Sequence, residues 1–161
     1  MEVIKVWMAD SNIVKHPDSI RTTGLGSCVG VTLYDPTKKV AGMAHVMLPS
    51  SSLAKNDEFK NAKYADTALP ELVDMVTKAG ANRTKLVAKM AGGAQMFNFG
   101  GNSDTMRIGP RNVEACKDVL KKLGIRIVAE DTGGSHGRTI ELYTDTGVLT
   151  IRTAMKDTKE I

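Results

Sequence analysis

The sequence contains few cysteines and no long apolar run. Its 161 residues include two cysteines, Cys28 and Cys116, too few for a disulfide framework and without the spacing of metal ligands. We therefore expect reduced thiols, a cytoplasmic location and no bound metal. Residues 1–12 mix charged with apolar side chains, unlike the apolar centre of a signal peptide. No segment reaches the length that crosses a membrane, so membrane insertion is not expected.

Aromatic residues are also scarce, at 4%, and the basic residues are spread along the chain. A nucleic-acid-binding surface needs clustered Lys and Arg, or aromatic side chains that stack on bases. The net charge of +4 is too diffuse for such a surface, so nucleic acid is not expected as a partner. The 42% apolar and 25% charged residues are typical of a globular protein. Without repeats or linkers, the sequence predicts one domain over residues 1–161.

Apolar periodicity predicts both strands and helices. Strands are expected at residues 2–9, just before GLGS, at 29–35 and at 40–48, with a polar bend at 15–19. The turn DPTKK joins the strands at 29–35 and 40–48 and predicts a hairpin. Helices are expected over residues 62–79 and from Pro110 to Gly124, and further strands at KLVAKM, IRIVAED, RTIELYT and GVLTIR. Regular β-α-β alternation is absent, which favours a mixed α/β domain rich in hairpins over a doubly wound parallel sheet.

The segment RTTGLGSCVGVTLYD, residues 21–35, places Cys28 between a glycine turn and a strand. Such glycines suggest a phosphate-binding loop, but a dinucleotide site needs a helix directly after them. A P-loop needs Lys followed by Ser or Thr, whereas Val31 and Thr32 follow Gly30. The segment therefore disfavours nucleotide binding.

A cysteine nucleophile fits this segment better. A thiol needs a base to deprotonate it, commonly histidine, and a third group to orient that base. His45 lies in the next predicted strand, one hairpin away from Cys28, and Thr22 precedes the turn, where its hydroxyl can orient the ring. Gly26 leaves room for a substrate carbonyl, and the N–H groups near Ser27 and Cys28 are candidate donors to an oxyanion.

The same residues also fit a purely structural interpretation. A lone cysteine beside Val is commonly a small buried hydrophobe, and a histidine inside an apolar strand is commonly a core residue. Cys116 lies on the apolar stripe of the second predicted helix, which indicates core packing. His16 is expected in a solvated bend, and His136, in TGGSHGR, fits either a hairpin turn or a loop that reaches a substrate. Residue types alone leave both interpretations open.

The bend AGGAQMFNFGG, residues 91–101, places three large apolar side chains among glycines. A peptide or a partner helix can dock on such a segment. Met96, Phe97 and Phe99 are therefore candidate contacts for a substrate or partner.

The segment TTGLGSCVGVTLYD, followed by AGMAHVMLPSS, resembles the signature of the CheD family, the chemoreceptor glutamine deamidases of bacterial and archaeal chemotaxis. AGGAQMF, IGPRNV, LKKLGI and EDTGGSHGRTIEL resemble the same family in the same order, so the similarity covers nearly the whole chain. It implies a cysteine hydrolase that converts glutamine side chains on chemoreceptor helices to glutamate and ammonia. The nucleophile then falls on Cys28, the base on His45 and the orienting residue on Thr22, with no cofactor.

The resemblance further implies a layered α/β (α+β) sandwich with a mixed, largely antiparallel sheet flanked by helices, similar to toxin-type cysteine deamidase domains. The implied partners are the cytoplasmic helical bundle of chemoreceptors and a CheC-type phosphatase, whose activity rises while deamidation is restrained. Two other functions remain open. One is a related acyl-transfer enzyme, a transglutaminase or a peptidase, and the other is a binding module that regulates a phosphatase.

Overall fold

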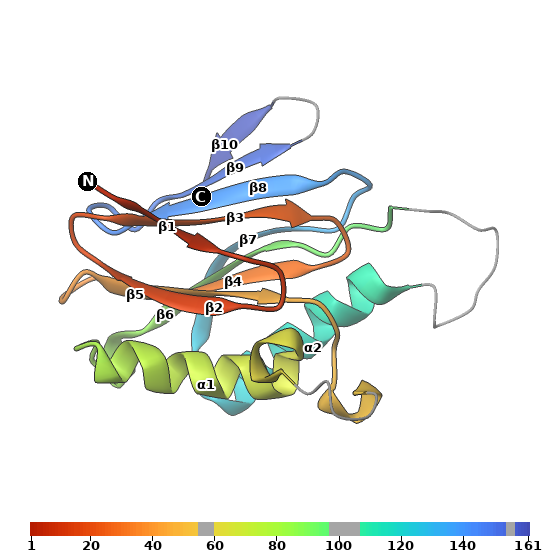
Figure 1. The fold of residues 1–161 in the computed structure, drawn as a ribbon, viewed down its shortest axis with the longest axis horizontal. Coiled ribbons are helices and arrows are strands. Elements are labelled where there is room, and N and C mark those ends of the chain that lie inside the picture. Colours follow the sequence, from red (N-terminus) through yellow and green to blue (C-terminus); the bar gives the residue numbers. More distant parts are fainter. Residues whose placement is uncertain (55–59, 97–106, 154–156) are drawn as a thin grey trace.

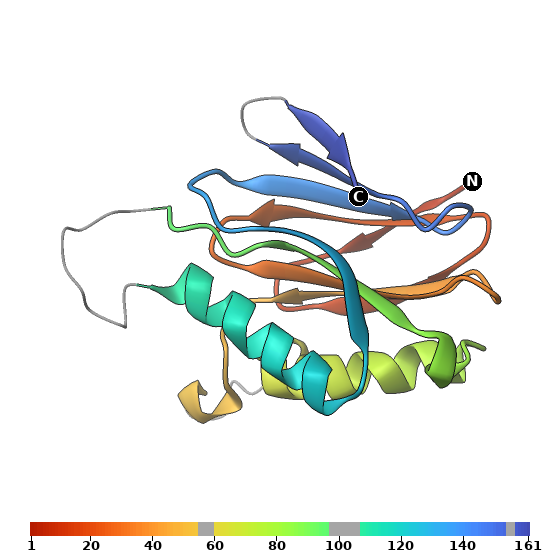
Figure 2. The same ribbon diagram turned by 180° about the vertical axis from the view of Figure 1, so that it is seen from behind.

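The computed structural model describes residues 1–54, 60–96, 107–153 and 157–161. Its elements form three layers: two β-sheets packed face to face, and helices on the outer face of the second sheet (Figure 1). The view from behind shows the same order of layers (Figure 2). The predicted α+β sandwich is therefore confirmed.

The first sheet contains the first and last strands of the chain. In spatial order its strands are β1 (Val3–Val6), β3 (Ser19–Leu25), β8 (Arg138–Tyr143), β9 (Leu149–Thr153) and β10 (Thr158–Glu160). β1 and β3 run parallel and pair Val6 with Thr22, whereas the other neighbouring strands run antiparallel.

The second sheet lies in the middle of the molecule. Its strands, in spatial order, are β2 (Ser11–Lys15), β5 (Val40–Val46), β4 (Val29–Asp35), β6 (Val87–Gly92) and β7 (Arg126–Thr132). β6 and β7 run parallel, and the other pairs run antiparallel. All residues of β4 and β5 are buried, because the first sheet covers one face of these strands and the helices cover the other.

The helices α1 (Ala65–Lys78) and α2 (Ile108–Lys122) form the third layer, and the described residues also include short 3-10 turns at Ser51–Leu53, Asn61–Lys63 and Arg83–Lys85. Alternate residues of the central strands enter two separate cores. Val31 and Ala44 face the helices, whereas Tyr34 and Met43 face the first sheet. The space between the two sheets is therefore a second core, and the site described below lies at its edge.

The predicted hairpin of β4 and β5 is confirmed, but the single strand predicted at residues 2–9 is wrong. The chain leaves β1 after Val6 and turns back into β2 at Ser11. The carboxylate of Asp10 accepts a hydrogen bond from the Trp7 N–H at 3.2 Å, and Ala9 has a φ of 55°, so the turn stops the strand. β2 was missed because its pairing with β5 joins distant segments.

The other predicted boundaries differ by a few residues. The bend predicted at 15–19 is shorter, because Lys15 ends β2 and Ser19 begins β3, and the strand predicted at 40–48 ends at residue 46. The helix predicted over 62–79 spans 65–78. α2 begins two residues before Pro110, which therefore lies in the first turn, where its missing N–H leaves no hydrogen bond unmade. β10 was missed, since three exposed polar residues carry no strand pattern.

Candidate active site

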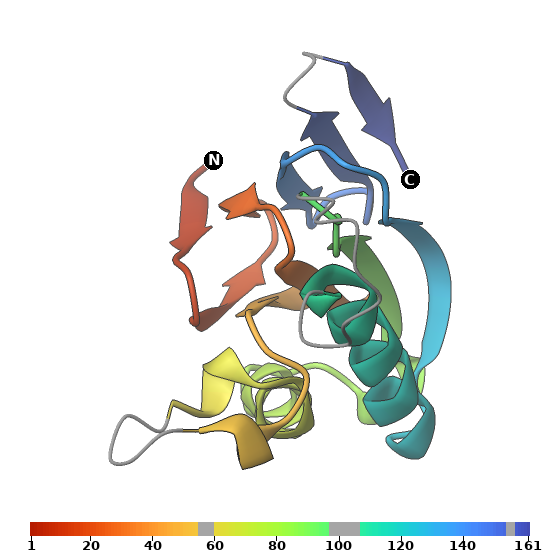
Figure 3. The ribbon, with the colours of Figure 1, turned by 90° about the vertical axis from the view of Figure 1, so that its right-hand side faces the viewer.

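Residues 26–28 carry the chain from β3 in the first sheet to β4 in the second. This bend lies at the end of the molecule that faces the viewer in Figure 3, close to the start of α2. The main chain that follows β6 holds it in place, because the Gly93 N–H donates to the Cys28 carbonyl at 2.9 Å and the Ala94 N–H to the Gly26 carbonyl at 2.9 Å. Cys28 is 8% exposed, so its thiol lies at the rim of the core between the sheets.

His45 is fully buried on β5 and pairs with Gly30 of β4. Cys28 belongs to the core between the two sheets, and His45 contacts Thr22 of the first sheet, so both side chains lie on the face of the second sheet that is turned toward the first. Cross-strand neighbours that are offset by two positions lie roughly 7–8 Å apart, a distance that a long or aromatic side chain can span. The hairpin therefore brings the two residues to one face, offset by two positions rather than directly opposite.

Gly30 allows the two sheets to approach each other beside His45. A Cβ atom at this position would lie 2.6 Å from Cδ1 of Ile140 and 3.2 Å from Cδ1 of Leu25, both in the first sheet. Gly26 has a looser environment, because a Cβ there would lie 3.3 Å from Cγ of the Met96 side chain. Of these two glycines, Gly30, which lies opposite His45, is therefore the one that the packing requires.

The hydroxyl of Thr22 links His45 to the first sheet. Its Oγ1 donates to the Val6 carbonyl at 2.8 Å and lies 2.8 Å from Nδ1 of His45. A hydroxyl has one hydrogen, which the Val6 bond uses, so Nδ1 must donate to the hydroxyl. The neutral ring therefore carries its proton on Nδ1 and presents a lone pair at Nε2. Nε2 is buried and has no hydrogen-bond partner among the described residues, the Cys28 thiol included.

Burial determines the protonation states of both groups. Loss of hydration lowers the pKa of His45 from 6.5 to about 4, although the charge of Asp10 acts in the opposite direction. Burial also raises the pKa of the Cys28 thiol, and the residue's own N–H opposes this effect. At neutral pH the free protein therefore holds a neutral imidazole and a neutral thiol, so the thiol must lose its proton before it can act as a nucleophile.

Two main-chain N–H groups of the bend that carries the thiol are candidate donors to a substrate. The N–H groups of Ser27 and Cys28 donate to no main-chain carbonyl within the described part of the chain. Fixed N–H groups of this kind can stabilise the negative oxygen that forms when a nucleophile attacks a carbonyl. The sequence analysis names these N–H groups as candidate oxyanion donors, and this role stays a prediction.

α2 contributes a residue that the sequence analysis missed. Asn112 is fully buried, and its Nδ2 donates to the Ser27 carbonyl and to the Met47 carbonyl, each at 2.9 Å. Ser27 precedes Cys28, and Met47 lies two residues after His45. A signal was present, because Asn112 lies one turn before Cys116 on the face of α2 that is otherwise apolar.

One of the three residues predicted to contact a substrate or partner lies close to this site. Met96 is 44% exposed and packs against Gly26, two residues from Cys28. Phe97 and Phe99 lie outside the described residues.

The two remaining histidines are not brought to the site. His16 lies 3.7 Å from the Asp145 carboxylate, and His136 is exposed between β7 and β8. Cys116 packs in the core between the helices and the second sheet, as predicted, and burial raises the pKa of its thiol to about 12. Within the described ranges, no three His, Cys, Asp or Glu side chains are grouped as metal ligands, and no helix is long and apolar enough to span a bilayer.

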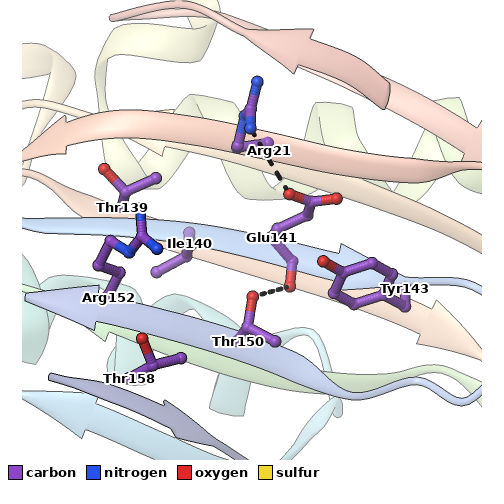
Figure 4. A pocket seen from close by; sticks show the side chains of 8 residues that line it. All are labelled: Arg21, Thr139, Ile140, Glu141, Tyr143, Thr150, Arg152 and Thr158. Carbon is purple, nitrogen blue, oxygen red and sulfur yellow. Dashed lines mark hydrogen bonds and ion pairs between the residues drawn. The ribbon is translucent and has the colours of Figure 1, made fainter. Parts of the chain in front are cut away.

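The outer face of the first sheet has a different, polar character. Arg21 precedes Thr22 and points to the opposite face, where its guanidinium lies 3.8 Å from the Glu141 carboxylate. Both line a hollow of about 280 Å³ together with Thr139, Ile140, Tyr143, Thr150, Arg152 and Thr158. Figure 4 shows these side chains. The sheet itself separates this hollow from Thr22 and His45, so the hollow is not part of the candidate site.

Comparisons with known proteins agree with one another. Residues 47–153 match the family described as CheD chemotactic sensory transduction. The chain is 61% identical to the chemoreceptor glutamine deamidase CheD of Halalkalibacterium halodurans over 160 residues, and this alignment covers 99% of each protein. It is 53% identical over 159 residues to the protein of the same name from Bacillus subtilis, covering 99% of this chain and 96% of the relative. A third relative of that name, from Bacillus licheniformis, is 55% identical over 151 residues, which are 94% of this chain and 90% of the relative.

Proposed function

The chain belongs to the CheD family, and on this premise we propose that it is a protein-glutamine deamidase of chemoreceptors. It converts glutamine side chains on the cytoplasmic helices of these receptors to glutamate and releases ammonia. The names of its relatives, chemoreceptor glutamine deamidases, support this activity. The protein acts in the cytoplasm, where those helices lie.

The observation that carries the proposal is the hydrogen bond between Nδ1 of His45 and the Thr22 hydroxyl. It leaves Nε2 as a proton acceptor on the face that His45 shares with Cys28. A buried neutral base beside a thiol is the arrangement that nucleophilic cysteine catalysis requires. Thr22 has the orienting role that a third residue has in catalytic triads.

The first half of the reaction forms a thioester. When substrate binds, the Cys28 thiol turns toward Nε2, and His45 takes its proton as the sulfur attacks the carboxamide carbon. Hydrogen bonds that are long or absent in a free enzyme commonly form at this stage. The N–H groups of Ser27 and Cys28 stabilise the resulting oxyanion. The C–N bond then breaks, the imidazolium gives its proton to the leaving nitrogen, and ammonia departs.

The second half releases glutamate. His45 removes a proton from water, whose oxygen attacks the thioester carbon. The C–S bond breaks, and the imidazolium returns its proton to the sulfur. One glutamine side chain and one water thus become one glutamate side chain and one ammonium ion, and the thiol is regenerated.

Removal of the thiol tests the assignment of the nucleophile. We expect Cys28→Ala to reduce ammonia release from a receptor helix fragment at least about a thousandfold. Cys116→Ala is the matched control, because it also removes a buried thiol but lies in the core between the helices and the second sheet. Its rate should stay within about twofold of wild type. Ammonia release by Cys28→Ala at the rate of the control would refute the proposed nucleophile.

The mass of the substrate distinguishes deamidation from other thioester chemistry. Deamidation adds about 1 Da per glutamine, a transglutaminase adds the mass of an amine, and a peptidase shortens the chain. We expect the first change alone, both with and without an added primary amine.

A CheC-type phosphatase is a proposed second partner. Met96 lies against the bend of Cys28, so a partner that docks there would also cover the thiol. If regulation of the phosphatase were the main role, Cys28→Ala would retain both full phosphatase stimulation and full receptor adaptation in cells. We expect the variant to lose adaptation that depends on deamidation.

A further inference from the structure

Asn112 is buried without any exposed surface, yet the reaction proposed above gives it no role. Its Nδ2 group has two hydrogens, and both are used, one on the Ser27 carbonyl and one on the Met47 carbonyl. The first carbonyl belongs to the bend that carries Cys28, and the second follows the strand that carries His45. One amide therefore ties together the two segments that meet at the site.

The bond to Ser27 also determines the direction of a proposed oxyanion donor. The Ser27 carbonyl and the Cys28 N–H belong to one peptide unit, which is planar and trans, so they point in opposite directions. The carbonyl points toward Asn112 on α2, in the helix layer. The Cys28 N–H must therefore point away from the helix layer, toward the space between the sheets. The pKa of the thiol agrees, because this N–H lies close enough to the sulfur to oppose the effect of burial.

The start of α2 packs closely against the segment after β6 that holds this bend. A Cβ atom at Gly109, one turn before Asn112, would lie 2.2 Å from the Ala94 carbonyl and 2.7 Å from the Gly93 carbonyl. The N–H groups of Gly93 and Ala94 in turn hold the carbonyls of Cys28 and Gly26. The helix is thus seated closely enough for a short side chain to hold the Ser27 peptide in one orientation.

From these contacts we propose that Asn112 is a positioning residue for the reaction of Cys28. It holds the Cys28 N–H toward the developing oxyanion and holds the bend in register with the end of β5. It touches neither substrate nor the reacting atoms. The inference rests on the proposed deamidase function and deepens it.

The test compares two variants that keep the size of the side chain and remove both donors, Asn112→Asp and Asn112→Leu. Loss of one oxyanion donor commonly costs about a hundredfold to a thousandfold in kcat. A donor that is present but poorly oriented should cost less, so we expect kcat for ammonia release from a receptor helix fragment to fall about tenfold to a hundredfold. KM should change by less than about threefold, because the substrate's ground state does not need this donor.

The matched control is Thr144→Val. Thr144 is also fully buried, and its hydroxyl donates to the Asp18 carbonyl at 2.6 Å. It follows Tyr143, which pairs with Ser19 at the end of β3 far from Cys28. This variant loses a buried bond to a carbonyl without affecting the bend, so its kcat should stay within about twofold of wild type.

Three results would overturn the proposal: kcat values of the Asn112 variants that match the control, a loss that lies in KM alone, or a failure to fold of every variant. If the two isosteric variants do not fold, Asn112→Ser retains one donor and leaves space for water, and a smaller fall in kcat is expected. Cys28→Ala separates this inference from the function itself. If Cys28→Ala is inactive and the Asn112 variants are fully active, only the role of Asn112 is wrong. If Cys28→Ala is active, the proposed nucleophile is wrong, and if the wild-type protein releases no ammonia, the proposed function fails.

Discussion

The Thr22 hydroxyl is the most direct point at which to test the proposed site. Thr22→Val keeps the shape of the side chain and removes the one oxygen that both donates to the Val6 carbonyl and accepts from Nδ1 of His45. The variant leaves two buried polar groups without a partner. It also removes the only contact among the described residues that holds the ring proton on Nδ1.

The size of the effect follows from these two bonds. A buried polar group that loses its partner costs about 1–3 kcal/mol. In the variant an N–H on either ring nitrogen lacks a partner among the described residues, so the preference for the proton on Nδ1 is lost, and the imidazolium that forms when His45 takes the proton also loses its hydrogen bond to the Thr22 hydroxyl. A hydrogen bond to a charged group contributes about 1.5–3 kcal/mol, and about 1.4 kcal/mol is a factor of ten, so kcat should fall about tenfold to a hundredfold. The free energy of unfolding should fall by about 1–3 kcal/mol.

Two measurements check this reasoning. The first is kcat for ammonia release at saturating receptor fragment, with Thr22→Ser as the control that retains the hydroxyl. The second is the pair of imidazole ¹⁵N chemical shifts of His45, which distinguish the two tautomers. We expect Thr22→Ser to stay within about threefold of wild type, because it loses a methyl group but retains both hydrogen bonds.

Either of two outcomes would refute the reasoning. One is equal kcat for the Val and Ser variants when both are fully folded. The other is a wild-type spectrum with the proton on Nε2, because the hydrogen-bond pattern around Thr22 then assigns the wrong role to the hydroxyl.

Three further predictions concern pH and packing. His45 must be neutral to accept a proton, so kcat/KM should fall only as pH drops through about 4, and a midpoint near 6.5 would show that burial does not lower its pKa. In the unfolded state His45 binds a proton below about pH 6.5, whereas in the folded state it does so only below about pH 4, so the folded protein loses stability over this range as pH falls. Urea unfolding should show that the free energy of unfolding is unaffected by His45 above pH 6.5 and falls by up to about 3 kcal/mol as pH drops to about 4. His45→Asn should not show this loss. Gly30→Ala should cost about 1–3 kcal/mol of unfolding free energy, because its Cβ would lie 2.6 Å from Cδ1 of Ile140. Ile140→Val removes that atom, so an equal cost of Gly30→Ala in both backgrounds would exclude this clash as the cause.

The local features of the site were predictable from the sequence. The strands at residues 29–35 and 40–46 alternate regularly and are joined by a short turn, so the hairpin that brings Cys28 and His45 to one face follows from neighbouring residues. The core position of Cys116 follows in the same way from helical spacing. These predictions depend on residues close together in the chain.

The contacts that complete the site depend on pairings between distant segments. The Val6 carbonyl reaches Thr22 because β1 and β3 run parallel, although a single strand was predicted over residues 2–9. Asn112 reaches Ser27 across 85 positions of sequence, and no local pattern specifies that distance. A polar residue on an apolar helix face indicates a buried hydrogen bond but does not identify its partner.

The sequence by itself determined the chemistry that is available: a thiol in a glycine bend, a histidine one strand away, a hydroxyl just before the bend, and the family resemblance that links them. The tertiary structure decided how these groups are used. Burial of His45 keeps its ring neutral. The Thr22 hydroxyl donates its hydrogen to the Val6 carbonyl, so the ring proton lies on Nδ1. Asn112 holds the peptide that precedes Cys28. Tautomer, pKa and donor direction depend on neighbours in space, and for this site those neighbours come from β1 and α2, far from Cys28 in the chain.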